Sequence, residues 1–392
     1  MTTPLQIGFI PLIDAAGLIV AVEKGFTEAE GLDVTLVREV SWSNVRDKLN
    51  IGLFDAAHLL APVPIASSLG LGHIKVPIVA PLNLSLNGNA ITVSPALHAA
   101  IRTEIDDDRP DPMATAQALS RVVATRRRNG GEPLTFGMTF PFSTHNYQLR
   151  FWMAAGGIDP DEDVRLVVLP PPFMVDSIAS GQIDGFCVGA PWNSIGVDRG
   201  VGQILHFGSD IMQRAAEKVL ATRQLWAEKN PQTLAALVRA VFRAAEFVEA
   251  AENRDEVARM LSRNEYIGVD AAVVMRTLEG RLKIAPDGAI RESGRYMLLA
   301  KEDASTPDPV QAAWLYAQMV RWRQTPVSAE GLKTAQGVFR SDLYRAALGR
   351  DGGPSQAIST FAGPAFDPGN IEAYLAGLRL GPGKPEIPLT TK

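Results

Sequence analysis

Short apolar runs alternate with amphipathic segments along the first half of the chain. The runs have the length and composition of buried strands, and the segments between them carry the apolar spacing of helices. Strands separated by helices of about ten residues predict βαβ units and mostly parallel sheets, so we expect an α/β fold. The runs that predict strands lie at 6–11, 34–38, 55–60, 75–84, 134–138, 164–169 and 184–188.

Capping residues predict where two of the helices begin. Asp14 is expected to cap a helix over 15–24, because a short acidic side chain can accept from the free N–H groups of a first turn. Ser43 is expected to cap the next helix in the same way. The long amphipathic segments at 231–250 and 310–323 predict that the last part of the chain is mainly helical.

The overall composition is that of an ordinary globular protein. A chain of 392 residues is longer than a single hydrophobic core usually accommodates, so two lobes are expected. Apolar residues make up 46% and charged residues 21%, which excludes disordered and fibrous classes. The formal net charge of −5 argues against a nucleic-acid surface. A small-anion site remains possible, because it needs only a few local donors.

The single cysteine and the N-terminus bear on the compartment. One thiol, Cys187, excludes an intrachain disulfide, and its apolar strand predicts a buried structural residue. Met1 leads into the first predicted strand without a secretory signal. If this start is the native one, we expect a cytoplasmic protein, although a trimmed mature chain would look similar. No apolar stretch has the length of a membrane span.

Five segments of the sequence carry a specific resemblance. In order and spacing they resemble the nitrate- and bicarbonate-binding proteins of ABC uptake systems, over roughly residues 5–330. The missing signal peptide makes the chain look most like the cytoplasmic branch of that family, the NasS-type nitrate/nitrite sensors. The segments are SWSNVRDKL at 41–49, LNLSLNGNAITVS at 82–94, STHNYQLRFWMAAGGIDPDEDV at 143–164, PPPFMVDSIASGQIDGFCVGAPWN at 170–193 and EKVLATR at 217–223.

The resemblance implies a two-lobed, type II periplasmic-binding-protein-like fold. The first lobe would comprise residues 1–92 and 205–392, and the second lobe residues 93–204. Ligands of open α/β sheets bind beyond the carboxyl ends of the strands. That rule places the ligand in the cleft between the lobes.

A selective site for nitrate, a planar monoanion, needs in-plane donors, one cation and a flat wall, with no carboxylate close by. The resemblance assigns these parts to Trp42, Asn89, Thr144, His145 and Lys218. The residues themselves agree in part. An indole offers both a flat face and an N–H donor, and His145 stands at the start of a predicted helix, beside free backbone N–H groups.

Three positions near this site differ among the relatives. Asn89 stands where nitrate binders have glutamine, so its reach is about one methylene shorter. Ala190 replaces the glutamate of a Gly-Glu-Pro-Trp-Asn segment, a weak sign of a role other than transport. Lys218 stands where bicarbonate binders have an acidic residue and a metal, which favours nitrate or nitrite and no metal or cofactor. Its neighbour Glu217 is expected to point elsewhere.

Three functions stay open at this point. The first is a sensor that binds nitrate or nitrite and controls an antiterminator partner with an RNA-binding ANTAR-type domain. The second is the substrate-binding receptor of a nitrate transporter. The third is an enzyme with Cys187 or His145 at its centre, which the lack of a base–nucleophile pair disfavours. We expect no direct contact with nucleic acid or membrane.

Overall fold

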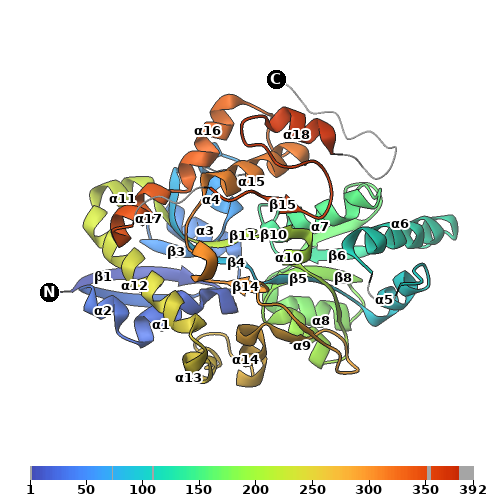
Figure 1. Cartoon of the computed structure of the whole chain (residues 1–392), viewed down its shortest axis with the longest axis horizontal. Coiled ribbons are helices and arrows are strands. Elements are labelled where there is room, and N and C mark those ends of the chain that lie inside the picture. The colour runs from blue at the N-terminus through green and yellow to red at the C-terminus, as the bar shows by residue number, and fades with distance from the viewer. Residues whose placement is uncertain (1, 73, 108–109, 351–354, 379–392) are drawn as a thin grey trace.

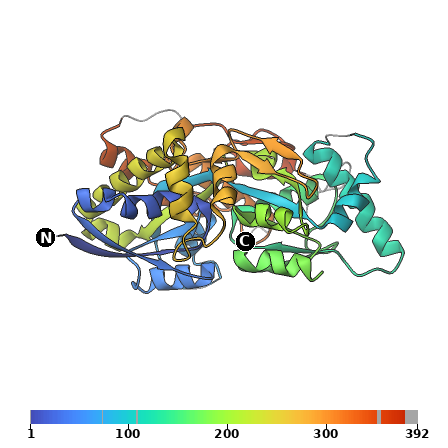
Figure 2. The same cartoon turned by 90° about the horizontal axis from the view of Figure 1, so that it is seen from below.

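The computed structural model describes residues 2–72, 74–107, 110–350 and 355–378. Two β-sheets lie side by side along the long axis of the molecule, and helices cover both (Figures 1 and 2). The N-terminal strand belongs to the first sheet, and the helices near the C-terminus lie above both sheets in the view of Figure 1. The prediction of an α/β fold is therefore confirmed.

The first sheet has six strands. β1 pairs in parallel with β2 and β3, whereas β11 pairs antiparallel with β3 and β4. Every residue of β3 and of β4 is buried. In order across the sheet the strands are β14 (Met297–Leu298), β4 (Ile78–Asn87), β11 (Ala216–Arg223), β3 (Ala56–Leu60), β1 (Thr3–Phe9) and β2 (Leu32–Arg38).

The second sheet has five strands. β6 pairs in parallel with β7 and β8, and β5 pairs antiparallel with β8 and β9. Two smaller sheets pair β10 (Met212–Gln213) with β15 (Ser359–Thr360), and β12 (Arg281–Lys283) with β13 (Ile290–Glu292). In order the five strands are β7 (Arg165–Val168), β6 (Thr135–Met138), β8 (Gly185–Gly189), β5 (Asn89–Val93) and β9 (Gln203–Phe207).

Both sheets are mixed, and parallel pairs do not dominate them. The strands β4, β5 and β11, which lead from one sheet to the other, all pair antiparallel with their neighbours. The chain changes sheet at Gly88, between β4 and β5, and again over residues 208–215. The division into lobes of 1–92 plus 205–392 and 93–204 stays a prediction.

Helices connect and cover the strands. Helix α7 follows β6, α12 packs beside α1 on the first sheet, and α15 lies in the upper part of the molecule in Figure 1, below α16 and α18. The described α-helices are α1 (Ala16–Glu23), α2 (Phe26–Ala29), α3 (Trp42–Asn50), α4 (Pro62–Leu69), α5 (Pro95–Arg102), α6 (Pro112–Arg128), α7 (Thr144–Ala155), α8 (Met174–Ala179), α9 (Trp192–Asp198), α10 (Gly208–Ile211), α11 (Gln224–Lys229), α12 (Pro231–Glu249), α13 (Arg254–Leu261), α14 (Ala271–Glu279), α15 (Pro309–Arg321), α16 (Ala329–Val338), α17 (Ser341–Leu348) and α18 (Ile371–Gly377). Across the described ranges, no helix combines the length and the apolar character needed to cross a membrane.

Both predicted helix caps are wrong. Asp14 lies inside a short 3₁₀ helix, η1 (Ile13–Ala15), and its carboxylate contacts another side chain instead of capping α1. Helix α3 begins at Trp42, two residues earlier than expected, so the cap position falls on Ser41. Its hydroxyl accepts from the N–H of Asn44 at 3.3 Å. The capping chemistry was therefore right for α3, but its register was not.

Candidate functional site

Lys218 lies near the middle of the first sheet and is fully buried. Consecutive residues of a regular strand point to opposite faces. The pairing of β11 with β4 shifts register on both sides of Lys218, however, and such irregularities re-aim side chains. As a result Glu217 and Lys218 point into the same region, and the Lys218 Nζ donates to Glu217 Oε1 at 2.8 Å.

A second carboxylate reaches the same ammonium group. Asp14 follows β1 at its carboxyl end, and its Oδ2 lies 2.9 Å from Lys218 Nζ. Its other oxygen, Oδ1, lies 2.8 Å from Nε2 of His58, which projects from β3. Asp14, His58 and Lys218 are each at most 1% exposed. Lys218 is therefore held between two buried carboxylates.

Glu217 joins the two sheets. Its Oε1 lies 3.0 Å from Nε2 of His145, the second residue of α7. Its Oε2 accepts from the amide of Asn89, the first residue of β5, at 2.7 Å. The prediction that Glu217 points elsewhere is wrong, because the irregularity of β11 turns it toward the predicted site residues.

Trp42 forms one wall of this cluster. The Lys218 Nζ lies 5.4 Å from the centroid of its ring, and the ring of His58 packs against it edge-on at 5.3 Å. The indole N–H is buried and has no hydrogen-bond partner among the described residues. Trp42 thus combines a flat face toward the cation with a free donor.

Thr144 has a different place. Its hydroxyl donates to the backbone carbonyl of Ala216 at 2.7 Å, which ties the start of α7 to β11. The N-cap of this helix is Ser143, whose hydroxyl accepts from the N–H of Asn146 at 3.1 Å. In this conformation the hydrogen of Thr144 is not available to an anion. Four of the five predicted residues lie around Glu217 and Asp14, namely Trp42, Asn89, His145 and Lys218. Thr144 instead holds the start of α7 against β11.

The ionisation of the cluster follows from its burial and its contacts. Burial alone would raise the pKa of Asp14, but Lys218 and His58 outweigh it and lower that pKa to about 2. Burial also acts to raise the pKa of Glu217, and His145 and Lys218 together hold it below its ordinary value. Burial acts to lower the pKa of Lys218, but the two carboxylates raise it.

The histidines do not add charge at neutral pH. Burial is the largest influence on His58 and on His145, and it lowers both pKa values below the ordinary 6.5. The cluster then holds two carboxylates, Asp14 and Glu217, against one ammonium, Lys218. Its net charge is one negative unit, which differs from the expected cationic site free of carboxylates.

The sequence interpretation missed Asp14, His58 and Glu217 as parts of the site. A histidine inside the otherwise apolar strand Ala56–Leu60 was a usable signal, because such a buried ring needs a polar partner. Asp14 lies in the segment that leaves the carboxyl end of the first strand, where sites of α/β proteins form. Gln148 also lies near Asn89, because both side chains approach Gly208. A Cβ atom added at Gly208 would lie 1.8 Å from Asn89 Oδ1 and 3.0 Å from Gln148 Oε1.

Two other candidates have structural roles. Cys187 is buried in β8, and burial raises the pKa of its thiol well above the ordinary range, so it is not an activated nucleophile. Ala190 is 2% exposed, and its carbonyl accepts from the N–H of Ile13 at 3.0 Å. Within the described part of the chain, no group of three or more histidine, cysteine, aspartate or glutamate residues is arranged to hold a metal.

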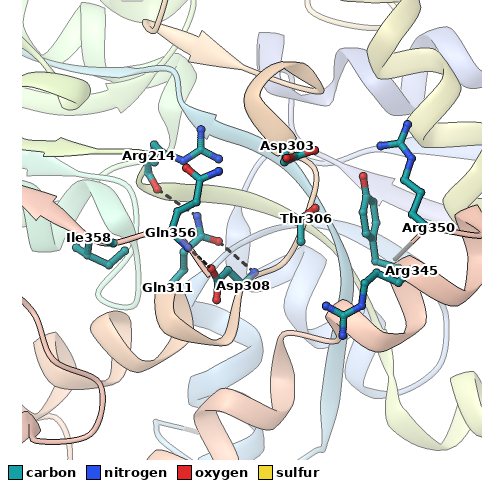
Figure 3. A pocket seen from close by; sticks show the side chains of 11 residues that line it. Arg214, Asp303, Thr306, Asp308, Gln311, Arg345, Arg350, Gln356 and Ile358 are labelled. Atoms are coloured by element: carbon teal, nitrogen blue, oxygen red, sulfur yellow. Dashed lines mark hydrogen bonds between the residues drawn. The ribbon is translucent and has the colours of Figure 1, made fainter. Parts of the chain in front are cut away.

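A separate cavity is lined by other residues (Figure 3). It measures about 240 Å³ and is bordered by α15, α17 and residues 356–358. Several of its polar groups form hydrogen bonds within the protein. Gln311 donates to the carbonyl of Arg214 at 3.2 Å, and Asp308 accepts from the N–H groups of Val310 at 2.9 Å and Gln356 at 3.1 Å. The five predicted site residues do not line this cavity.

Comparison with known proteins places the chain in a family. The model of the NMT1-like family matches residues 1–262. The chain belongs to the NMT1-like family. The nitrate/nitrite binding protein NrtA of Synechococcus elongatus is 33% identical over 391 residues, which cover 96% of this chain and 86% of that protein.

Two further relatives define the fold and the range of the family. The crystal structure of the periplasmic nitrate-binding protein NrtA from Synechocystis has a TM-score of 0.88 and 29% identity, and the match covers 96% of this chain and 99% of that chain. The bicarbonate transport ATP-binding protein CmpC of Synechococcus elongatus is also 33% identical, over 95% of this chain. The chain spans about half the length of such ATP-binding relatives, 54%.

These relatives decide two of the predictions. The expected periplasmic-binding-protein fold is confirmed by the match to NrtA along almost the whole of both chains. The expectation of a binding protein, not an enzyme, is confirmed by the same relatives.

Proposed function

We propose that this protein binds one nitrate or nitrite ion at Lys218 and acts in the cytoplasm as a sensor. In this proposal its ligand state controls an antiterminator partner with an ANTAR-type RNA-binding domain. The observation that carries the anion site is the convergence of Trp42, Asn89, His145 and Lys218, far apart in sequence, on one buried cluster. The names of the NrtA relatives support the choice of anion.

The chemistry of the cluster suits a small planar anion. Lys218 supplies a cation, and Asn89 and His145 supply side-chain donors from the second half of the molecule. Trp42 offers a flat face and an unused N–H beside the ammonium group. A lysine with side-chain donors binds an anion without a metal, so this donor set favours nitrate or nitrite over a metal-assisted bicarbonate site.

Calorimetric titration tests the anion site. Purified protein is titrated with nitrate, nitrite, bicarbonate and sulfate, and we expect one-to-one binding of nitrate or nitrite. Lys218→Ala should abolish it, because the only ammonium group in the cluster is lost. Lys333→Ala, at an exposed lysine on α16, is the matched control and should bind like the wild type.

A second variant guards against loss of folding. Lys218→Ala leaves Asp14 and Glu217 buried without their cation, which destabilises a protein by about 3–5 kcal/mol. His145→Ala removes a donor that is neutral at neutral pH and keeps the ion pairs of Lys218. It should weaken nitrate binding at least about tenfold while the protein stays folded. Tight binding of bicarbonate alone would contradict the choice of anion.

The sensor role rests on how a ligand shifts an equilibrium. Donors from elements of both sheets meet at the cluster, so an anion held there stabilises the arrangement in which they meet. It acts on a partner only through the difference between its affinities for two arrangements. We infer that the antiterminator binds the ligand-free arrangement and is released by the anion.

A transport receptor is the second candidate, and the similarity to NrtA along both chains favours it. One pull-down separates the two roles. The tagged protein is mixed with the co-encoded antiterminator, with and without nitrate. Loss of the complex on addition of nitrate supports the sensor. No complex under either condition, with nitrate-dependent binding to a permease assembly, supports the receptor.

A further inference from the structure

Glu217 occupies the donors that the anion needs. Its Oε1 lies 2.8 Å from Lys218 Nζ and 3.0 Å from His145 Nε2, and its Oε2 lies 2.7 Å from Asn89 Nδ2. These are three of the residues predicted to bind nitrate. The side chain of Glu217 is fully buried, so no solvent shares its oxygens. A carboxylate of the protein itself therefore lies within 3.0 Å of all three groups.

A carboxylate and a nitrate ion are bound by the same kind of site. Both are planar, both carry one negative charge spread over oxygens, and both accept hydrogen bonds in their plane. Donors placed to hold one are suited to hold the other. The contacts of Glu217 thus have the chemistry expected of a bound nitrate or nitrite.

The charge of the cluster prevents the ionised side chain of Glu217 and a nitrate or nitrite ion from being held there at the same time. Asp14 and Glu217 already give it one net negative unit against Lys218. A second unit added to this buried site by an incoming anion would lack a counter-charge, and buried unpaired charge is strongly unfavourable. The anion can enter only if one carboxylate withdraws or is neutralised.

We propose that Glu217 is an internal competitor for the anion, and that nitrate or nitrite binds when Glu217 releases its three donors and takes up one proton from solvent. The proposal rests on the anion site proposed above. The proton adds to a carboxylate oxygen of Glu217, and the resulting O–H needs an acceptor. Asn89 Oδ1, on the amide that now contacts Glu217, is buried without a hydrogen-bond partner among the described residues and can serve.

Glu217 is the group best placed to take this proton. Asp14 is held by both Lys218 and His58, and these two contacts lower its pKa to about 2. Glu217 instead has an unpartnered acceptor beside it, Asn89 Oδ1, which can receive a hydrogen bond from a protonated carboxyl group. The remaining titratable groups that face Glu217 stay neutral, because burial lowers the pKa of the histidines and raises that of the thiol and the phenol. They are His58 on β3, His145 on α7, Cys187 on β8 and Tyr296 beside β14.

Glu217→Gln tests the proposal, because it keeps the shape of the side chain and removes its charge. Near neutral pH we expect the variant to bind nitrate about tenfold or more tightly than the wild type. From about pH 5.5 to about pH 8 the wild-type affinity should fall as pH rises, because the protonated form is the one that binds. The variant should show little of this slope. Glu330→Gln, an exposed glutamate on α16, is the matched control.

A measurement on the unmodified protein covers the case in which the variant fails to fold. Calorimetry of nitrate binding in two buffers of different ionisation enthalpy gives the number of protons taken up, and we expect close to one per anion near neutral pH. Uptake of none would overturn the proposal.

The outcomes separate the two proposals. Binding by the wild type that Glu217→Gln weakens or leaves unchanged overturns the competitor and leaves the anion site standing. Binding by the variant alone supports the competitor. If neither protein binds nitrate or nitrite across this pH range, the anion site and the competitor both fall.

Discussion

Gly208 allows α10 to approach the side chains of Asn89 and Gln148 closely. A Cβ there would lie 1.8 Å from Asn89 Oδ1 and 3.0 Å from Gln148 Oε1, and both side chains are fully buried. Gly208→Ala should therefore displace Asn89 from Glu217. We expect the free energy of unfolding to fall by about 1–3 kcal/mol in urea denaturation. Gly337→Ala, which meets no atom within 4 Å, is the control. Equal loss in both variants, or no loss at Gly208, would contradict this account.

Residue by residue, the sequence predicted the site only in part. Trp42, Asn89, His145 and Lys218 could be named because each sits in a segment that resembles a family motif. The sequence predicts Asp14 as a cap and Glu217 as pointing elsewhere, because both predictions use only neighbouring residues. Their actual partners lie far along the chain, and no local pattern reports such contacts.

Helix α3 carries Trp42 at its first position, so its start bears on the site. The Ser41 hydroxyl accepts from the N–H of Asn44, whereas the Ser43 hydroxyl lies 3.1 Å from the Ser41 hydroxyl. Ser41→Ala should lower the free energy of unfolding by about 1 kcal/mol. Ser43→Ala should change it by less than about 0.5 kcal/mol. Urea denaturation of both variants measures the difference. A larger loss of unfolding free energy in Ser43→Ala would show that Ser43 is the cap.

Elements were easier to predict than their pairing. Apolar runs mark buried strands directly, so β1, β3 and β8 lie within a few residues of the predicted runs. The irregular pairing of β11 with β4 left no such mark. It depends on which strand becomes the neighbour, and that is decided by the whole sheet. The same holds for the antiparallel strands that replaced an expected mostly parallel sheet.

For the whole molecule, buried histidines predict how stability depends on pH. Burial is the main cause that lowers the pKa of His206 from 6.5 to about 4, and it also lowers those of His58 and His145. A folded pKa below the unfolded one means that the stability is complete above about pH 6.5 and is lost as pH falls toward 4. His206 alone accounts for about 3 kcal/mol at pH 4. Asp14, with a pKa of about 2, titrates below this window.

Thermal melting from about pH 7.5 to about pH 4 measures this dependence. The melting temperature should fall steadily below about pH 6.5, and His206→Gln should flatten the curve because its side chain does not titrate. A wild-type curve that stays level down to about pH 4.5 would mean that the histidines are solvated in the folded protein.

The enclosure of the cluster predicts how fast an anion binds. Trp42, Asn89, His145 and Lys218 are each at most 1% exposed, and they come from elements of both halves of the molecule. An anion can reach Lys218 only after these elements separate, a motion that takes microseconds to milliseconds or longer. The observed rate should therefore level off as nitrate concentration rises, at the rate of opening. Stopped-flow tryptophan fluorescence measures it, with Trp42→Phe identifying the signal of the site. A rate that rises linearly to the highest concentration would mean that the anion enters without any opening, and the buried arrangement of Lys218 would then not be the one that meets the ligand.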